Sequence, residues 1–258
     1  MKTQTFILTI LLLVPVLLFS QNTVEQKKND SINKVDASNK RTGYWEEKTG
    51  DQFIKGYYVN DKRTGNWITC INTGLLLKLE SFDNGQRNGI SITLDRKGHL
   101  TKQEFYKNDK LNGLSVTYGQ YNELPLSQIN YLDGVKNGLS RIFYDNGKTQ
   151  EEATFKDGNK DGQSKWYSTT GKLMALYSYQ NGYFVGIQKT YYENDSIQST
   201  IFYSNNIING DYKEFYRNGI IKVSGTYING IKEGSWLDYD ETGKAVKTTK
   251  YKKGVAKQ

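Results

Sequence analysis

The sequence is poor in the residues that cross-link a chain or carry out catalysis. Its 258 residues include one cysteine, Cys70, and one histidine, His99. A single cysteine excludes an intramolecular disulfide, and one cysteine with one histidine cannot make a usual zinc site. Because His99 follows the turn glycine Gly98, we expect a solvated loop residue and no Cys–His or Ser–His–Asp arrangement. We therefore expect no catalytic, metal or cofactor-binding residues, and a stability that comes from packing alone.

Apolar residues are also scarce, at 36% of the chain, and there are only two prolines, Pro15 and Pro125. The aromatic share is nevertheless 13%, with 20 tyrosines and 10 phenylalanines, and there are 25 glycines. A sequence rich in tyrosine, punctuated by glycine and poor in alanine favours strands and tight turns over helices. The composition predicts an all-β structure that is thin and has much exposed surface.

The one long hydrophobic run is N-terminal. Lys2 precedes a run of 14 apolar-rich residues, Phe6 to Phe19. This is signal-peptide length and is short of the roughly 20 residues that span a bilayer. We expect residues 1–20 to be a signal peptide cleaved near Ser20, with an uncleaved anchor as the alternative because Leu18 is bulky for a signal peptidase. The protein is then periplasmic, cell-surface or secreted.

The exported chain is basic. Without Lys2 it carries 34 basic and 27 acidic residues, a formal charge of +7. Such a charge suits anionic lipid, acidic polysaccharide or an acidic partner. The lysines are spread along the chain, however, which favours simple solvation of strand faces. We expect a monomer without a nucleic-acid partner.

Glycine marks a repeat that fills most of the chain. Nine glycines recur at spacings of 22 to 25 residues, which indicates a repeat architecture. These structural anchors are Gly43, Gly65, Gly89, Gly113, Gly138, Gly162, Gly186, Gly210 and Gly234.

Other positions follow the same period when each anchor glycine is numbered zero. Position five is mostly aromatic, position nine is Gly, Asn or Asp from the second repeat on, position eleven is mostly aliphatic, and an aromatic residue stands at or near position seventeen in every copy. We call these the position-seventeen residues, although the first stands at position fifteen of the shorter first repeat and the fourth at position eighteen: Tyr58, Phe82, Tyr106, Tyr131, Phe155, Tyr179, Tyr203, Tyr227 and Tyr251.

These positions predict one β-hairpin per repeat. Gly, Asn and Asp at position nine tolerate the positive φ of a chain reversal. If that residue closes a three-residue loop, position five faces position eleven, so Tyr167 pairs with Leu173 and Phe215 with Ile221. Positions eleven, fifteen and seventeen share parity, so we expect one apolar and one polar face. A lone hairpin is barely stable, so neighbouring repeats must stack.

The pattern also divides the chain. We expect a flexible polar linker over residues 21–42, nine hairpin repeats over 43–254 and a tail over 255–258. The first repeat is atypical, with Lys48 at position five. The last strand carries four lysines between Lys247 and Lys253, and charge of this kind discourages strand addition at a sheet edge.

Some aromatic residues fall outside the packing positions. Neighbouring strand residues point to opposite faces, so side chains at position six are expected on the face away from the apolar stripe, joined by those at position two. This face could bind a sugar chain, a peptide strand or a lipid surface, although a second packing layer is the alternative. The candidate binding residues are Tyr144, Tyr192, Tyr216, Tyr212, Trp236 and Trp67.

Two copies of the repeat carry a family resemblance. Residues 210–219 (GDYKEFYRNG) and 234–243 (GSWLDYDETG) resemble the MORN repeat variant of exported bacterial proteins, including the group named YwqK antitoxin-like. The resemblance covers about residues 43–254. It implies an elongated single-layer antiparallel meander of about nine hairpins that serves as a non-enzymatic interaction platform, in some members associated with membranes.

Three functions follow as expectations. The first is an exported scaffold that mediates protein–protein or envelope-surface interaction. The second is a membrane- or glycan-surface binder with peripheral contact. The third is an antitoxin-like inhibitor, which rests on the family name alone and suits an exported chain poorly.

Overall fold

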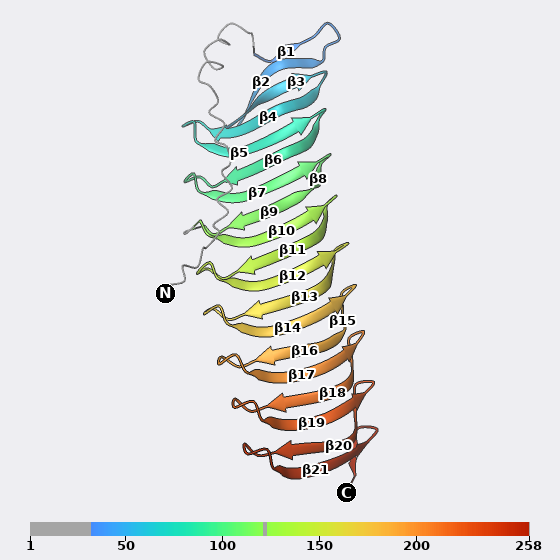
Figure 1. Cartoon of the computed structure of the whole chain (residues 1–258). Helices are drawn as coiled ribbons and strands as arrows, with labels where there is room; N and C mark the ends of the chain where they lie inside the picture. Colours follow the sequence, from blue (N-terminus) through green and yellow to red (C-terminus); the bar gives the residue numbers. More distant parts are fainter. Residues whose placement is uncertain (1–31, 121–122, 258) are drawn as a thin grey trace, which may run out of the picture.

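The computed structural model describes residues 32–120 and 123–257, and all regular structure within them is β-strand (Figure 1). The expected signal peptide lies outside these residues. The strands are β1 (Lys34–Val35), β2 (Arg41–Thr49), β3 (Gln52–Val59), β4 (Lys62–Ile71), β5 (Leu76–Asp83), β6 (Gln86–Leu94), β7 (Leu100–Lys107), β8 (Lys110–Leu111), β9 (Gly113–Tyr118), β10 (Pro125–Leu132), β11 (Val135–Phe143), β12 (Thr149–Lys156), β13 (Asn159–Tyr167), β14 (Leu173–Gln180), β15 (Tyr183–Phe184), β16 (Gly186–Tyr191), β17 (Ile197–Ser204), β18 (Ile207–Phe215), β19 (Ile221–Ile228), β20 (Ile231–Tyr239), β21 (Ala245–Lys252) and β22 (Val255–Lys257).

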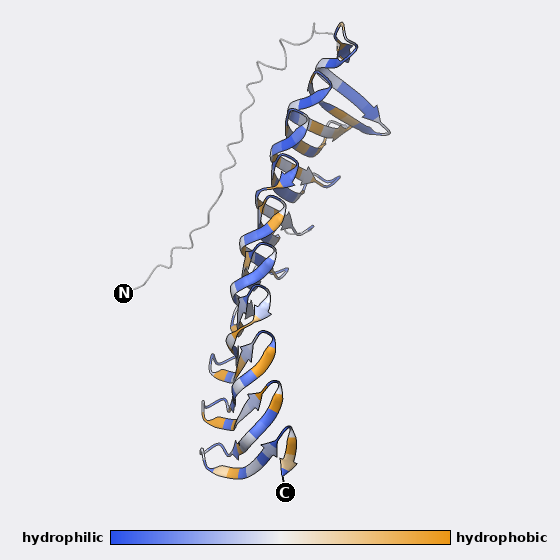
Figure 2. Ribbon diagram, turned by 90° about the vertical axis from the view of Figure 1, so that its right-hand side faces the viewer, coloured by the Kyte–Doolittle hydropathy of each residue, from blue (hydrophilic) through white to orange (hydrophobic). Residues whose placement is uncertain are grey.

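The strands form one open antiparallel sheet in which each strand lies beside its neighbours in sequence. The pairs β8–β9 and β15–β16 are interrupted strands, because β7 pairs with both β8 and β9 and β14 with both β15 and β16. The hairpins stack into a long, single-layered ladder whose strands curve along their length (Figures 1 and 2). The predicted single-layer antiparallel meander of hairpins is confirmed.

The predicted cross-strand register is also confirmed. Tyr167 pairs with Leu173, and Phe215 pairs with Ile221. In both hairpins a β-bulge lies directly beside this pair, and the bulge interrupts the two-residue alternation of faces. Position eleven therefore pairs with position five, whereas positions thirteen to seventeen pair with positions four to zero. The expectation that positions eleven and seventeen share a face is wrong for this reason.

Positive φ angles explain both classes of glycine. Gly219, at position nine, has φ +84° in the loop that reverses the chain. The anchor Gly210 has φ +144°, and a Cβ there would lie 3.2 Å from the Phe202 side chain. A non-glycine residue would be strained at either position. The anchors thus mark the point where each first strand bends next to its neighbour.

Backbone hydrogen bonds join adjacent repeats at the turns that connect one repeat to the next. The N–H of each turn residue there donates to the carbonyl of the residue two places before the preceding anchor glycine, as in Gly134 to Leu111 and Gly230 to Ile208, both 2.7 Å. The same bond joins Gly182 to Lys160. Because it recurs once per repeat, it fixes each hairpin relative to the one before it.

Both ends of the sheet extend beyond the predicted repeats. The residues expected as a linker include β1 and the start of β2, which pair through Lys34–Thr42 and Val35–Arg41. Those expected as a tail include β22, which pairs with the end of β21. The polar sequence of these segments does not predict strands. The short strands form because each segment lies beside a sheet edge with which its backbone can pair.

Candidate binding surfaces

One face of the sheet carries the side chains at positions two, fifteen and seventeen, and we call it the groove face. Position two is its most buried column. Trp67 is 2% exposed, Trp236 is 5% exposed and Ser164 is fully covered. The large residues lie near the two ends of the ladder, and small ones lie between. The buried members of this column are Trp67, Ser91, Ser115, Ser140, Ser164, Gln188 and Trp236.

At Trp67, Ser164 and Trp236 the size of the position-two side chain complements that of the residue nine places before its anchor glycine, which is position fifteen where the preceding repeat has 24 residues. A Cβ added to Gly56 would lie 2.3 Å from the Trp67 ring, and one added to Gly225 would lie 2.2 Å from the Trp236 ring. In the middle of the ladder Ala153 stands opposite Ser164. A tryptophan at position two thus packs flat against the backbone when the opposite residue is glycine. A serine occupies position two when the opposite residue is larger, as at Ala153.

A cation lies over the aromatic residue at position seventeen in several repeats. Arg41 lies 4.0 Å from the Tyr58 ring centroid, Arg87 lies 4.0 Å from that of Tyr106, and Lys136 lies 5.2 Å from that of Phe155. Such contacts contribute roughly 0.5–1 kcal/mol each at exposed sites. All the cations sit two residues before an anchor glycine, so they form a row along one side of the groove face. This cation row comprises Arg41, Arg63, Arg87, Lys136, Lys160 and Lys232.

Turn aspartates neutralise two members of the cation row. Arg41 pairs with Asp61 at 3.1 Å, and Arg87 pairs with Asp109 at 3.2 Å. The hydrogen bond from the Arg87 backbone N–H, with help from its guanidinium, lowers the pKa of the Asp109 carboxyl. These two arginines therefore act mainly in holding turns. Lys160 pairs with Glu151, so the net charge of the row comes from Arg63, Lys136 and Lys232.

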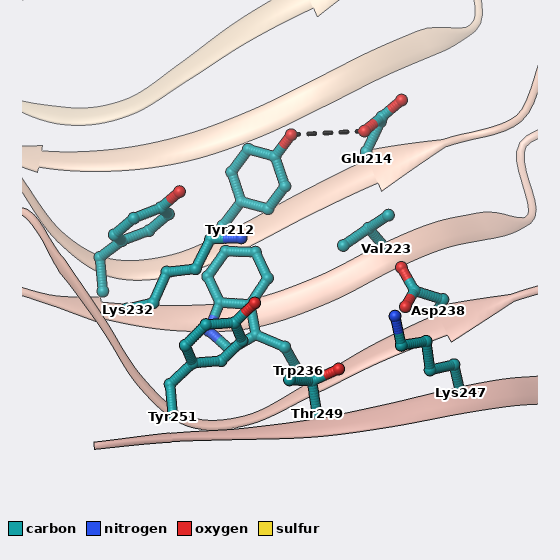
Figure 3. Close-up of a pocket in the computed structure, with 10 residues that line it drawn as sticks. Tyr212, Glu214, Val223, Lys232, Trp236, Asp238, Lys247, Thr249 and Tyr251 are labelled. Carbon is teal, nitrogen blue, oxygen red and sulfur yellow. Dashed lines mark hydrogen bonds between the residues drawn. The ribbon is translucent and has the colours of Figure 1, made fainter. Parts of the chain in front are cut away.

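A groove of about 350 Å³ lies on the groove face between β18 and β21 (Figure 3). Its aromatic wall is made by Tyr212, Tyr227, Trp236 and Tyr251. The Tyr212 and Trp236 rings stack 5.4 Å apart, Tyr227 meets Trp236 edge-on at 5.0 Å, and Lys232 lies 4.0 Å from the Trp236 centroid. The wall is rigid because each ring is held by another ring or by an ammonium group.

The far side of this groove is charged. Tyr212 donates a hydrogen bond of 3.4 Å to Glu214, which also pairs with Lys222 at 2.7 Å. Burial, followed by the negative charge of Glu214, raises the pKa of the Tyr212 phenol. That phenol therefore stays protonated at neutral pH. Asp238 and Lys247 line the same side. The groove combines a flat apolar wall with groups of both signs, which suits a peptide or another polar chain better than a small apolar ligand.

Tyr144, Tyr192 and Tyr216 have a role that the sequence did not reveal. Each stands at the start of the loop after its strand, so the alternation of strand faces does not apply. Each hydroxyl donates to a backbone carbonyl one repeat further on: Tyr144 to Tyr167 at 2.7 Å, Tyr192 to Phe215 at 2.8 Å and Tyr216 to Tyr239 at 2.7 Å. The three half-buried tyrosines join neighbouring loops.

Replacing these three tyrosines with phenylalanine should therefore lower stability. Each lost hydrogen bond should cost about 0.5–1.5 kcal/mol of unfolding free energy, because the carbonyl loses its partner while the ring remains. Urea denaturation of the Tyr144→Phe, Tyr192→Phe and Tyr216→Phe variants measures this. An unchanged unfolding midpoint in all three would show that the hydroxyls do not hold the loops.

The side chains at position two also lie on a different face from the one expected. The alternation of faces predicts Trp67, Tyr212 and Trp236 on the face away from the main aromatic stripe, but they pack against position-seventeen rings on the same face. Trp67 meets Tyr58 at 4.8 Å, and its Nε1–H donates to the Tyr57 carbonyl at 3.2 Å. Trp67 is therefore a packing residue. Tyr212 and Trp236 line the groove, so the structure brings only these two of the six candidates together.

The residues that could serve catalysis are occupied in turns or pairs. His99 contacts Asp95 within one turn, with 3.1 Å between Nδ1 and Oδ2, and Cys70 is buried. Glu151 and Glu152 are adjacent on a strand and point to opposite faces, where Glu151 pairs with Lys160 and Glu152 with Arg141. The two carboxyls therefore do not converge on a common substrate.

Within residues 32–120 and 123–257, His, Cys, Asp and Glu form no cluster of three or more that could hold a metal ion. Nor does this part of the chain contain a helix long and apolar enough to cross a bilayer.

The basic residues look scattered along the sequence, whereas the fold lines six of them up as the cation row. A signal was available, because a basic residue stands two places before six of the nine anchor glycines. The groove was not foreseeable in the same way. It depends on which ring a neighbouring repeat places beside Trp236.

A comparison with protein-family models matches the MORN repeat variant at residues 136–157, 160–181, 184–205 and 208–229. No curated protein matches the chain. The four matched segments run from β11 to β19, and the hairpins β4–β5, β6–β7 and β20–β21 outside them have the same register and the same turn geometry. Repeats of this family generally bind other molecules without catalysing a reaction. The chain therefore contains four tandem MORN repeats of the variant type within residues 136–229, and repeats of this type suggest a scaffold for interaction with protein or membrane.

Proposed function

We propose that the chain is an exported, non-catalytic scaffold that binds a protein partner through the groove between β18 and β21. The observation that carries the proposal is the aromatic wall of Tyr212, Tyr227, Trp236 and Tyr251, which faces charged groups of both signs across an open groove. Rigid aromatic side chains beside adaptable polar ones are typical of protein-binding surfaces. The apolar run of residues 6–19 supports export.

Site-specific photo-crosslinking tests this proposal. Val223 lines the groove, and the next residue, Ser224, points to the opposite face. A photoreactive amino acid at Val223 should crosslink to protein in the native envelope, whereas the same group at Ser224 should not. Equal crosslinking from both positions, or none from either, would contradict the proposal. An adduct that resists protease would instead indicate a glycan or lipid.

The cation row supports a second candidate, a membrane- or glycan-surface binder. Arg63, Lys136 and Lys232 in this row form no ion pair with a described carboxylate, and successive repeats lie about 10 Å apart, at two strand spacings each. Sedimentation with anionic liposomes or cell-wall polysaccharide separates this function from the first. Binding through the row must weaken as salt rises. The antitoxin-like function has no support from a described residue.

A further inference from the structure

The two edges of the sheet differ in how much of their outer side is paired. At the N-terminal end, β1 covers the start of β2, and the Asn33 side chain continues the pairing like a short strand. Its Nδ2 donates to the Glu46 carbonyl at 3.0 Å, and its Oδ1 accepts from the Glu46 N–H at 2.8 Å. Asn33 also donates its own N–H to the Tyr44 carbonyl at 3.0 Å. This edge is closed from Arg41 to Glu46.

The C-terminal edge is only partly closed. β22 pairs with β21 at Lys250, Tyr251 and Lys252 alone. Among the described residues, Ala245–Thr249 have no strand on their outer side, although β20 pairs with Ala245, Lys247, Thr248 and Thr249 on the inner side and a β-bulge leaves Val246 without a register partner. Val246 is 61% exposed. Five residues of an extended strand therefore present unpaired backbone groups over about 17 Å.

The side-chain charge on β21 and β22 themselves is of one sign. Lys244, Lys247, Lys250, Lys252, Lys253 and Lys257 lie in or beside β21 and β22. None of them forms an ion pair with a described carboxylate, and the strand itself carries no acidic residue. The nearest opposing acids in register are on β20, where Asp238 stands across from Lys247.

Lysines on both faces of the strand restrict what can pair with it. Lys247 points to the groove face, where it lines the groove, and Lys250 and Lys252 point to the opposite face. A second copy of this chain, paired edge to edge, would bring the two sets of ammonium groups together, and like charges across a ladder are destabilising. An incoming strand with carboxylates on both faces would instead place opposite charges across the ladder, which is stabilising.

We propose that the outer edge of β21, at Ala245–Thr249, binds an acidic extended segment of a partner protein as an added antiparallel or parallel strand. Backbone hydrogen bonds supply the pairing, and the lysines select Asp- or Glu-rich sequence over a second copy of the chain. The inference rests on the proposed role as a protein-binding scaffold and names the chemistry of the partner. Because the groove borders β21, one partner can occupy both.

Three synthetic octapeptides test this with the full exported chain: (Glu-Glu-Thr-Thr)2, (Lys-Lys-Thr-Thr)2 and (Glu-Glu-Pro-Pro)2, each fluorescently labelled. The paired residues place charge on both faces of an extended strand. The first should bind, with slower hydrogen exchange at the amides of residues 245–249. The second should not bind, because its charge is wrong. (Glu-Glu-Pro-Pro)2 has the same charge, but its neighbouring prolines remove half of the N–H donors from each edge of the strand, so it should bind at least about tenfold more weakly.

Charge reversal with a matched control locates the site. Lys247→Glu, Lys250→Glu and Lys252→Glu together should weaken the binding of (Glu-Glu-Thr-Thr)2 by about tenfold or more, and raised salt should weaken its binding to the native chain. Reversal of the exposed Lys62, Lys107 and Lys110 changes the net charge equally, away from the edge, and should have a small effect.

Several results would overturn the inference. One is equal binding of (Glu-Glu-Pro-Pro)2, which would indicate a general polyanion site, and another is no binding of (Glu-Glu-Thr-Thr)2. The others are equal effects of the two triple variants and dimerisation of the chain through this edge. The peptide assay needs no envelope partner. Its failure is therefore distinguishable from failure of the crosslinking at Val223.

Discussion

Gly225→Ala should destabilise the C-terminal repeats by about 1–3 kcal/mol, the usual cost of forcing extra volume into a packed site. An added Cβ would stand 2.2 Å from the Trp236 ring, and the ring is held in place by Tyr212 and Tyr227. The backbone at Gly225 does not have positive φ, so the effect comes from packing and not from strain. Urea denaturation followed by circular dichroism measures the change.

The control for this prediction is the same substitution with the tryptophan removed. In a Trp236→Ser background, residues 225 and 236 become an Ala–Ser pair like Ala153 and Ser164 in the middle of the ladder. Gly225→Ala should then cost nothing, and it should stabilise by a few tenths of a kcal/mol or more because alanine has less freedom in the unfolded chain. Additive effects of the two substitutions would contradict the close approach of Gly225 and Trp236.

Trp67→Ala should cost about 3–5 kcal/mol, as expected for the loss of a buried tryptophan. Trp67 lies on Gly56, meets Tyr58 at 4.8 Å and has the Arg63 guanidinium 4.2 Å from its ring centroid. Its removal deprives all three of packing. Calorimetry and amide exchange should show early loss of the N-terminal hairpins, because each repeat contacts only its neighbours.

Trp67→Phe provides the comparison. Phenylalanine keeps a ring on Gly56 but loses the hydrogen bond to the Tyr57 carbonyl, so the expected loss of stability is clearly smaller than with alanine. The sequence pattern alone suggests a ligand-binding role for Trp67 instead. If Trp67→Ala left stability unchanged and abolished partner binding, the ligand-binding role would be right and the packing role would be wrong.

The sequence by itself determined the repeat, the hairpin and the cross-strand register. The position-nine turn and the pairing of Phe215 with Ile221 depend on residues less than 10 positions apart, so the local pattern contains all the information needed. The periodic glycines could be assigned to structure for the same reason. Their positive φ is a property of a single bend.

Only the tertiary structure decided which aromatic residues are free to bind. Tyr192 donates its hydroxyl to a carbonyl 23 residues away, in the next repeat. Which side chain fits at position two depends on the size of the opposite residue in another repeat, as Gly225 and Trp236 show. The outer side of β21 is likewise open because no strand of the described residues lies beside Ala245–Thr249. Contacts between repeats set these features, and the pattern within one repeat does not encode them.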